Sequence, residues 1–319
     1  MFKSVSVIIP VRNRETLIGP CLEHLFKAAV PVVEQGTALE IVIADDASTD
    51  RSRDVVAAMR DRSPVPVKHV LLETRQGPAR ARNAALREAS GELVVFVDSD
   101  VVVESGFFEA HLAVYRDAGR EAFAVGTLVS VPSLEAALAR PQPTKWDYSG
   151  ATLDTANASV PWQALEAVGF FDPGFEGMGW QDLDLGRRLK AHGLTRVKAK
   201  NAVAYHIQPP IRTQEQLRAR LQKERERGAS ALRYMQKHPT LSAKLAAQDT
   251  RLHVFLNWLF RMGGLIHEDN VLDWVEWARR RGFVASEKMW LSGVINKAHL
   301  DSLAAAKRAA SRPSPPPSE

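Results

Sequence analysis

VVFVDSD, residues 94–100, is a nearly continuous apolar run that ends in two acids, Asp98 and Asp100. Residues 94–97 have the composition of a strand buried on both faces of a parallel sheet. Ligands of open α/β sheets bind at the carboxyl ends of the strands, which is where the two acids are expected. Two carboxylates at this spacing can hold a divalent cation together with a nucleotide diphosphate. An isolated pair is more often an acidic turn, so the interpretation depends on the rest of the chain.

The length and composition predict a large α/β domain with an appendage. The chain has 319 residues, 45% of them hydrophobic, which exceeds one typical domain and supports a sizeable core. The only cysteine, Cys21, excludes an internal disulfide and is consistent with a reducing compartment. Because Cys21 lies among apolar residues of the first expected helix, we interpret it as a buried, inert thiol.

No segment reaches the run of about 20 apolar residues that crosses a membrane. The apolar run near the N-terminus is short and continues into polar residues, unlike a secretory signal. We therefore expect a cytoplasmic protein, either free or attached peripherally to the inner face of the membrane.

The net charge of +5 is unevenly distributed. Residues 1–210 contain 23 Lys and Arg against 26 Asp and Glu, whereas residues 211–319 contain 19 against 11. The basic surplus lies entirely in the last third and needs a separate explanation from the acidic motifs.

Strand-like and helix-like segments alternate in the first half of the chain. Strands are predicted at 5–10, 39–44, 67–72 and 93–97, and helices at 15–29, 49–60 and 79–89. This order predicts an α/β fold with a mixed, mainly parallel sheet flanked by helices on both faces. Later segments predict helices at 107–118 and 182–192, strands at 122–128 and 202–206, and a loop at 169–179.

Long, charged helices are expected from Thr213 onward. We predict a domain at 1–210, a helical extension at 211–309, and a disordered tail at 310–319 because of its Pro and Ser content.

Four polar segments follow the predicted strands. They are Pro10-Val11-Arg12-Asn13, Asp45-Asp46, the Gly77–Arg82 region and Asp98-Ser99-Asp100. Their glycines let the backbone come close to a phosphate, and their arginine side chains can form ion pairs with phosphates.

Together these segments resemble the family-2 glycosyltransferases of the GT-A fold. The matching segments are VSVIIPVRN, IVIADDASTD, GPARARNAAL, VVFVDSD, ANASVPWQALEAVGFFDPGFEGMGWQDLDLGRRLKAHG and AYH. Together they extend over roughly residues 4–206. The resemblance implies a metal-dependent, inverting transfer of a sugar from a nucleotide diphosphate donor to a hydroxyl of a glycan, lipid or protein. UDP is the favoured nucleotide, with GDP and dTDP as alternatives.

The resemblance also implies roles for individual residues. The nucleotide site would comprise Pro10, Val11, Arg12, Asn13, Asp45, Asp46, Gly77, Arg82, Asp98 and Ser99. A Mn²⁺ or Mg²⁺ ion would be held by Asp98, Asp100 and His206. Sugars would contact Asn157, Trp180 and Gln181, and Trp146 is a further aromatic candidate. The alternatives are a strand-end histidine for His206, a solvated helix face for Arg82 and core aromatics for the tryptophans.

Inversion needs a carboxylate that takes the proton of the attacking hydroxyl. The family's usual Glu-Asp pair reads Gln181-Asp182 here, so Asp182 inherits the role of the base. Gln181 departs from the pattern, and Asp182 could alternatively only begin a helix, where acids are favoured.

The extension carries Trp258, Trp274, Trp277 and Trp290 and no recognised motif. It could pack beside the acceptor site, form a homodimer or contact anionic lipid. Nucleic acid is not expected as a partner. Two other functions remain open: a sugar-nucleotide nucleotidyltransferase, although residues 7–17 lack the glycines of its phosphate loop, and a non-catalytic nucleotide-sugar or glycan-binding protein.

Overall fold

The computed structural model describes residues 2–145, 147, 151–175, 177 and 179–311. The chain forms two compact units. Unit 1 comprises residues 1–174 and 181–210, and unit 2 comprises residues 175–180 and 211–319. Most of the expected C-terminal tail lies outside the described residues.

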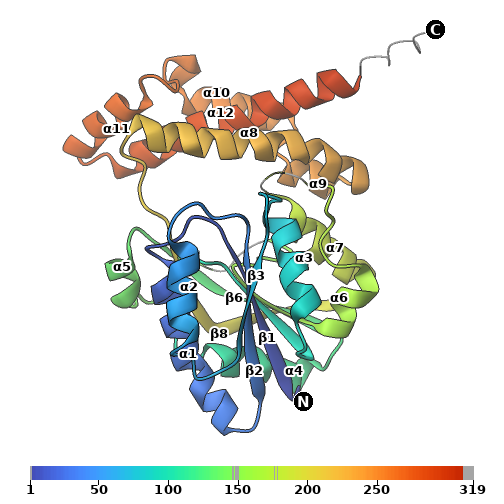
Figure 1. The fold of residues 1–319 in the computed structure, drawn as a ribbon. Helices are drawn as coiled ribbons and strands as arrows, with labels where there is room; N and C mark the ends of the chain where they lie inside the picture. The colour runs from blue at the N-terminus through green and yellow to red at the C-terminus, as the bar shows by residue number, and fades with distance from the viewer. Residues whose placement is uncertain (1, 146, 148–150, 176, 178, 312–319) are drawn as a thin grey trace. The chain divides into compact units, whose positions relative to one another are not determined.

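Unit 1 is built around an eight-stranded sheet (Figure 1). The spatial order is β3-β2-β1-β4-β7-β6-β8-β5. The strands are β1 (Ser4–Val11), β2 (Ala38–Asp45), β3 (Val67–Leu71), β4 (Leu93–Val97), β5 (Val101–Val103), β6 (Ala122–Val131), β7 (Asn157–Pro161) and β8 (Thr195–Ile207). β3, β2, β1 and β4 are mutually parallel, β7 is antiparallel to β4 and β6, and β6 is parallel to β8.

Helices cover both faces of this sheet. They are α1 (Ile18–Glu34), α2 (Ser52–Arg60), α3 (Pro78–Glu88), α4 (Phe107–Ala118), α5 (Leu134–Leu138), α6 (Trp162–Val168) and α7 (Gln181–Ala191). One apolar core unites α1, α2 and α4 with the sheet, and a second unites α3, α6 and α7 with it. The predicted α/β class with a mixed, mainly parallel sheet is therefore confirmed. Cys21 is fully buried in the first core, and its burial raises the pKa of the thiol.

Sequence patterns missed β5 and β7. β5 has only three residues, and β7 carries Asn157, Ser159 and Pro161, which are depleted in strands. β7 forms because Asn157 meets polar groups of three neighbouring elements in the core, which a local pattern does not reveal.

The first strand extends one residue past its predicted end at Pro10, because Val11 also pairs with β2. The last pair between β1 and β4 is Ile8 with Phe96. Pro10 lies beyond this pair, where the missing amide hydrogen of proline costs no bond to β4.

The second helix begins at Ser52, three residues later than predicted, and has no side-chain cap. Ser48 and Thr49 instead bind the loop after β1. The amide of Asn13 donates to Ser48 Oγ at 3.1 Å, and the amide of Thr49 donates to Asn13 Oδ1 at 2.9 Å. These bonds join the carboxyl ends of β1 and β2.

A buried polar network centred on Asn157 links the antiparallel half of the sheet. Its amide nitrogen donates to the carbonyls of Thr127 at 2.9 Å and Ala202 at 2.8 Å, and its Oδ1 lies 2.9 Å from His111 Nε2. A Cβ at residue 126 would lie 2.2 Å from Asn157 Oδ1, so only Gly126 leaves room for this side chain.

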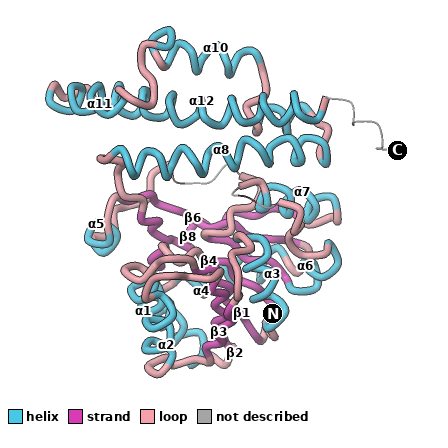
Figure 2. Tube along the Cα trace, turned by 45° about the horizontal axis from the view of Figure 1, so that its top comes forward, coloured by secondary structure: helices cyan, strands magenta, loops and turns pink. Residues whose placement is uncertain are grey.

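Unit 2 is helical. It contains α8 (Gln214–Lys237), α9 (Leu241–Ala246), α10 (Arg251–Phe260), the 3₁₀ turn η1 (Met262–Gly264), α11 (Val271–Arg280) and α12 (Val284–Ala310). In Figure 2, α12 lies between α8 and α10. The close approach of α8 and α12 depends on Gly228, because a Cβ there would lie 2.3 Å from the carbonyl oxygen of His299.

The core of unit 2 gathers apolar residues around Trp290, whose ring lies 5.6 Å from that of Trp274. Trp180 also belongs to unit 2. Its ring stacks on Tyr234 with centroids 4.9 Å apart, and its Nε1 donates to the carbonyl of Arg227 at 2.7 Å. Within the described part of the chain, no helix combines the length and apolar character needed to cross a bilayer.

We predict that His111 makes the stability of the fold depend on pH. Burial lowers the pKa of His111 from 6.5 to about 4, and its bond to Asn157 opposes this only in part. Between pH 6.5 and about 4, the histidine is protonated in the unfolded chain but neutral in the folded chain. The free energy of unfolding is therefore highest above pH 6.5 and decreases as the pH falls toward 4. The slope for one proton is roughly 1.4 kcal/mol per pH unit.

Urea unfolding of wild type and His111→Gln at pH 7, 6 and 5 measures this contribution. The variant should lose less stability than wild type as the pH decreases. His192→Gln, at an exposed position just after α7, is the matched control and should keep the wild-type slope. Equal slopes for wild type and His111→Gln would contradict the prediction.

Candidate functional site

A buried cation connects two of the predicted site carboxylates. Arg82 lies in α3, and its guanidinium places Nη2 2.7 Å from Asp98 Oδ1 and Nη1 3.8 Å from Asp182 Oδ1. Asp98 directly follows β4, and Asp182 lies in the first turn of α7. Three segments far apart in the sequence therefore meet at the carboxyl end of β4.

The Arg82 side chain is only 7% exposed, so it is not the solvated helix residue of the alternative interpretation. Burial opposes its charge, but Asp98 and then Asp182 outweigh this effect and raise the pKa of Arg82. A buried charge is costly unless partners of opposite sign surround it, so the two carboxylates and the arginine require one another.

The two oxygens of Asp182 have different surroundings. Thr155 Oγ1 donates to Oδ2 at 2.9 Å, whereas Oδ1 has no hydrogen-bond partner in the described part of the chain. The pKa of Asp182 is raised to about 6, first by loss of solvent; Arg82 opposes the rise, and Asp154 and Asp98 add to it. One oxygen is thus anchored while the other can accept a proton near neutral pH.

Asp100 forms a second charged group with Arg14 and His206. Its Oδ2 lies 3.3 Å from Arg14 Nη2, and its Oδ1 lies 3.4 Å from His206 Nε2. Burial opposes the charge of Asp100, but His206 and Arg14 outweigh it and lower the pKa of this carboxyl. Burial likewise opposes the charge of His206, but Asp100 raises the pKa of the ring. The structure thus brings together two residues that are 106 positions apart in the chain.

A cavity of about 340 Å³ adjoins these residues within unit 1. Asp98, Asp154 and His206 line it, together with Asp147 and Gln208. The sequence analysis missed Asp154 and Thr155, because they lie in a segment, 130–155, with neither a strand nor a helix pattern. The only local signal is that Asp154 and Thr155 directly precede the segment ANASV, which supports the resemblance.

The implied Mn²⁺ or Mg²⁺ would need oxygen or nitrogen donors beside this cavity. Carboxylate and imidazole donors are chemically suitable, and Asp98 and His206 face the same cavity. However, among the described residues no group of three or more His, Cys, Asp and Glu side chains is arranged to hold a metal ion. The physical reason is that Asp98 pairs with Arg82 and Asp100 pairs with Arg14. The donor types fit a divalent cation, and ligation would replace these arginine pairs.

The predicted nucleotide-binding segments form connected loops at the same edge of the sheet. The Asp46 carboxylate accepts the amides of Gln76 at 2.6 Å and Gly77 at 3.0 Å, and the Arg12 guanidinium donates to the carbonyls of Asp46 and Ala47. Gly77 has a φ of 87°, which an L side chain rarely adopts, and it leads directly into α3.

Two other predicted nucleotide contacts are internal. Asp45 is fully buried, and its Oδ1 accepts from the Ser48 amide at 2.7 Å and from Arg53 Nε at 3.1 Å. Ser99 is also buried. Asp45 thus holds the loop that follows β2, and neither residue presents its side chain to the surface.

The predicted sugar contacts are dispersed. Asn157 is buried, with its amide engaged in the β6–β8 network, so it is not brought to the cavity. Trp180 is the core aromatic of the alternative interpretation, 3% exposed in unit 2. Gln181 is buried in the first turn of α7, directly before Asp182. Trp146 lies outside the described residues.

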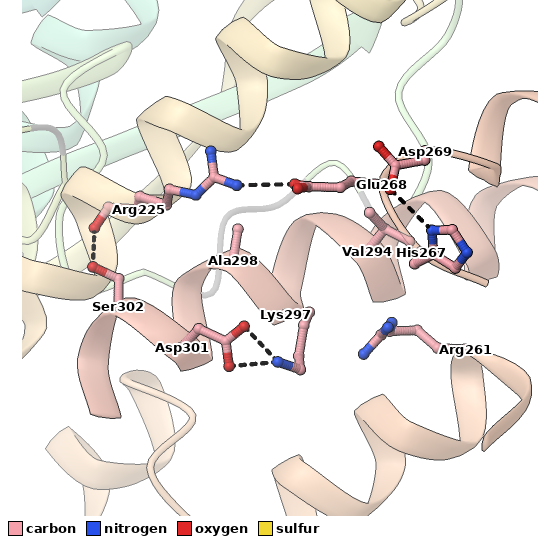
Figure 3. Close-up of a pocket in the computed structure, with 10 residues that line it drawn as sticks. All are labelled: Arg225, Arg261, His267, Glu268, Asp269, Val294, Lys297, Ala298, Asp301 and Ser302. Carbon is pink, nitrogen blue, oxygen red and sulfur yellow. Dashed lines mark hydrogen bonds and ion pairs between the residues drawn. The ribbon is translucent and has the colours of Figure 1, made fainter. Parts of the chain in front are cut away.

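A larger cavity of about 580 Å³ lies in unit 2 (Figure 3). Most of its polar side chains pair with one another: Arg225 with Glu268 at 2.9 Å, His267 with Asp269 at 3.4 Å, and Lys297 with Asp301. Arg261 donates from Nε to the carbonyl of Ile266 at 2.9 Å. None of the residues that the sequence predicts for the site lines this cavity.

Comparisons with known proteins agree with this geometry. Residues 6–155 match the family described as Glycosyl transferase family 2. The match covers just under half of the chain. The chain is 28% identical over 289 residues to the validoxylamine A glucosyltransferase of Streptomyces hygroscopicus, covering 79% of this chain and 65% of that protein. The chain thus spans less than two thirds of the length of this relative.

Solved structures show the same fold at low identity. The mannosyltransferase PcManGT from Pyrobaculum calidifontis, in complex with GDP-Man and Mn²⁺, matches with a TM-score of 0.57 and 19% identity, covering 98% of this chain and 88% of that one. Staphylococcus aureus TarS 1–349 in complex with UDP matches with a TM-score of 0.53 and 17% identity, covering 96% and 91%. The predicted GT-A fold is confirmed. The segment that matches the glycosyltransferase family lies within unit 1.

We predict that Thr155 holds the pKa of Asp182 down. Its hydroxyl donates to the charged carboxylate, so Thr155→Val should raise the pKa of Asp182 above about 6, by roughly one unit. A carboxyl ¹³C NMR titration of Asp182 measures the shift. Thr155→Ser keeps the hydroxyl and should restore the wild-type value. An unchanged titration in Thr155→Val would show that the bond does not control this carboxylate.

Proposed function

We propose that this protein transfers a sugar from a nucleotide diphosphate donor to a hydroxyl of a glycan, lipid or protein acceptor, with inversion at the anomeric carbon. The observation that carries the proposal is the state of Asp182: one oxygen is anchored by Thr155, the other has no hydrogen-bond partner among the described residues, and the pKa is raised to about 6. A non-catalytic binding protein would not need such a carboxylate, and the match to a glycosyltransferase family favours transfer over nucleotidyl transfer.

Asp182 acts as the general base. An inverting displacement requires the acceptor hydroxyl to attack the anomeric carbon from the face opposite the leaving diphosphate. As the new carbon–oxygen bond forms, the carboxylate of Asp182 accepts the hydroxyl proton. A base with a pKa of about 6 is ionised at neutral pH and still has affinity for a proton, which is the compromise that general-base catalysis favours.

Arg82 lies between the proposed base, Asp182, and Asp98 at the predicted donor site. Its guanidinium keeps Asp182 and Asp98 in a fixed relation, and its positive charge is available to the phosphate oxygens of a donor. Asp98, Asp100 and His206 would hold Mn²⁺ or Mg²⁺, which as a Lewis acid neutralises charge on the diphosphate leaving group.

The nucleotide would bind at the loops that follow β1 and β2 and precede α3. Asp46 and Arg12 already fix these loops through backbone groups, so the binding edge is ordered before a ligand arrives. UDP is the nucleotide that we favour from the resemblance, and GDP is the alternative carried by the mannosyltransferase complex. A thermal-shift screen of nucleotide sugars with Mn²⁺, followed by a product assay, would identify the donor.

We predict that Asp182→Asn abolishes transfer but preserves nucleotide binding. The amide cannot accept the hydroxyl proton, so kcat should decrease by about 10² to 10⁴ fold. In wild type, kcat should increase as the pH rises through about 6, because the base must be deprotonated. Donor turnover and calorimetry with the nucleotide measure the two properties separately.

Glu166→Gln, an exposed acid-to-amide change in α6, is the matched control and should leave both properties unchanged. Near-normal turnover by Asp182→Asn would remove Asp182 from the role of base.

A second prediction concerns the cation. Asp100→Asn removes a charged donor, so the gain in nucleotide affinity that Mn²⁺ provides should decrease at least tenfold. Calorimetry with and without Mn²⁺ measures this gain independently of turnover. Asp117→Asn, at an exposed position in α4, is the control. An equal gain in wild type and Asp100→Asn would contradict the assignment of Asp100 as a ligand.

A further inference from the structure

Helix α10 (Arg251–Phe260) presents its apolar residues to solvent and packs through a polar one. Asn257 is only 3% exposed, and its side-chain nitrogen donates to the carbonyl of Gly293 in α12 at 2.7 Å. The apolar residues of the other face are between 48% and 62% exposed: Leu252, Val254, Phe255, Trp258, Leu259 and Met262. This is the reverse of an ordinary surface helix, which turns its apolar stripe to the core.

The exposed residues form one continuous face. At about 100° per residue, positions 252, 255 and 259 follow one another along one side of α10, with 254 and 258 beside them, and Met262 lies in the 3₁₀ turn that follows. The rings of Phe255 and Trp258 stack with centroids 6.0 Å apart. In Figure 2, α10 lies on α12, and α12 in turn lies on α8, so α10 is an outer layer of unit 2. A contiguous apolar patch of this kind commonly marks an interaction surface.

The charges within this segment have one sign, and the acids that flank it, Asp249 and Glu268, pair with Lys307 and Arg225. The segment 250–266 contains Arg251 and Arg261 and no Asp or Glu. Arg251 is exposed at the start of α10, and Lys244 is exposed on the preceding helix. Residues 211–319 as a whole carry 19 Lys and Arg against 11 Asp and Glu. Whatever covers the apolar face must therefore tolerate or prefer a basic surrounding.

We propose that the apolar face of α10 docks on an anionic lipid bilayer, with the helix lying in the plane of the interface. Apolar side chains would enter the boundary between headgroups and acyl chains, Trp258 and Phe255 are side chains suited to that depth, and Arg251 and Lys244 would contact headgroup phosphates. The attachment is peripheral, consistent with the finding that no described helix can cross a bilayer. This inference is independent of the proposed transfer reaction.

Charge distinguishes the bilayer from a second copy of the chain. In a symmetric dimer through α10, Arg251 and the basic surplus of each extension would face those of the other copy, and like charges repel. An anionic bilayer reverses the sign of this interaction, so the apolar burial and the electrostatic attraction act together.

Vesicle flotation of the full chain tests the proposal. The vesicles are phosphatidylcholine alone, or phosphatidylcholine with about one third phosphatidylglycerol, at low and high salt. The wild type should float with the anionic vesicles, less at high salt, and poorly with the neutral ones. The double variant Phe255→Glu/Trp258→Glu should partition at least tenfold less.

Leu71→Glu, at a 54% exposed apolar position at the end of β3, is the matched control and should float like wild type. The milder variant Trp258→Gln/Leu259→Gln, checked by circular dichroism, preserves the test if the glutamates disturb the helix. Unchanged flotation of a folded α10 variant, equal flotation on neutral vesicles, or no flotation of wild type at low salt would each overturn the proposal. So would a concentration-dependent wild-type dimer that the α10 variants abolish.

Discussion

The site depends on one buried charge. The guanidinium of Arg82 is almost excluded from water, so it must keep anionic partners, and the two within reach come from the end of β4 and the start of α7. The same interaction orients Asp182 and keeps Asp98 at the edge of the cavity. Removing Arg82 would leave two neighbouring carboxylates without a compensating charge, whereas removing Asp182 would leave the pair of Arg82 with Asp98. The ion pairs of Arg82 therefore contribute both to the stability of the fold and to the orientation of the proposed catalytic carboxylate.

The sheet explains why these groups can meet. β4 lies between parallel β1 and antiparallel β7, so the direction of the strands changes beside it. Loops from both halves of the sheet converge at such a change of direction, and ligands of α/β proteins commonly bind there. The antiparallel half is fixed by the polar network of Asn157, in which His111 and the carbonyls of β6 and β8 satisfy every polar atom of the amide. The buried hydrogen-bond network thus fixes the antiparallel strands that lie beside the site.

Sequence reasoning succeeded where the local pattern and the function coincide. The apolar run before Asp98 specifies a buried strand, and the acid follows directly from it. It failed where identical residue types serve different purposes. Asn157 and Trp180 belong to the same matched text as Asp182, yet the first closes a core network and the second packs on Tyr234 in unit 2. Asp154 was missed because an acid in an irregular segment has no periodicity to mark it.

By itself, the sequence determined the α/β class, the family resemblance and the order of the acidic motifs, because each depends on residues that are close in the chain. Only the tertiary structure decided which of those acids share an environment. It buried Arg82 between Asp98 and Asp182, gave Asp182 its raised pKa, and turned the apolar face of α10 outward. Desolvation and ion pairing act between residues that are close in space but up to about a hundred positions apart in the chain, so local sequence patterns do not predict them.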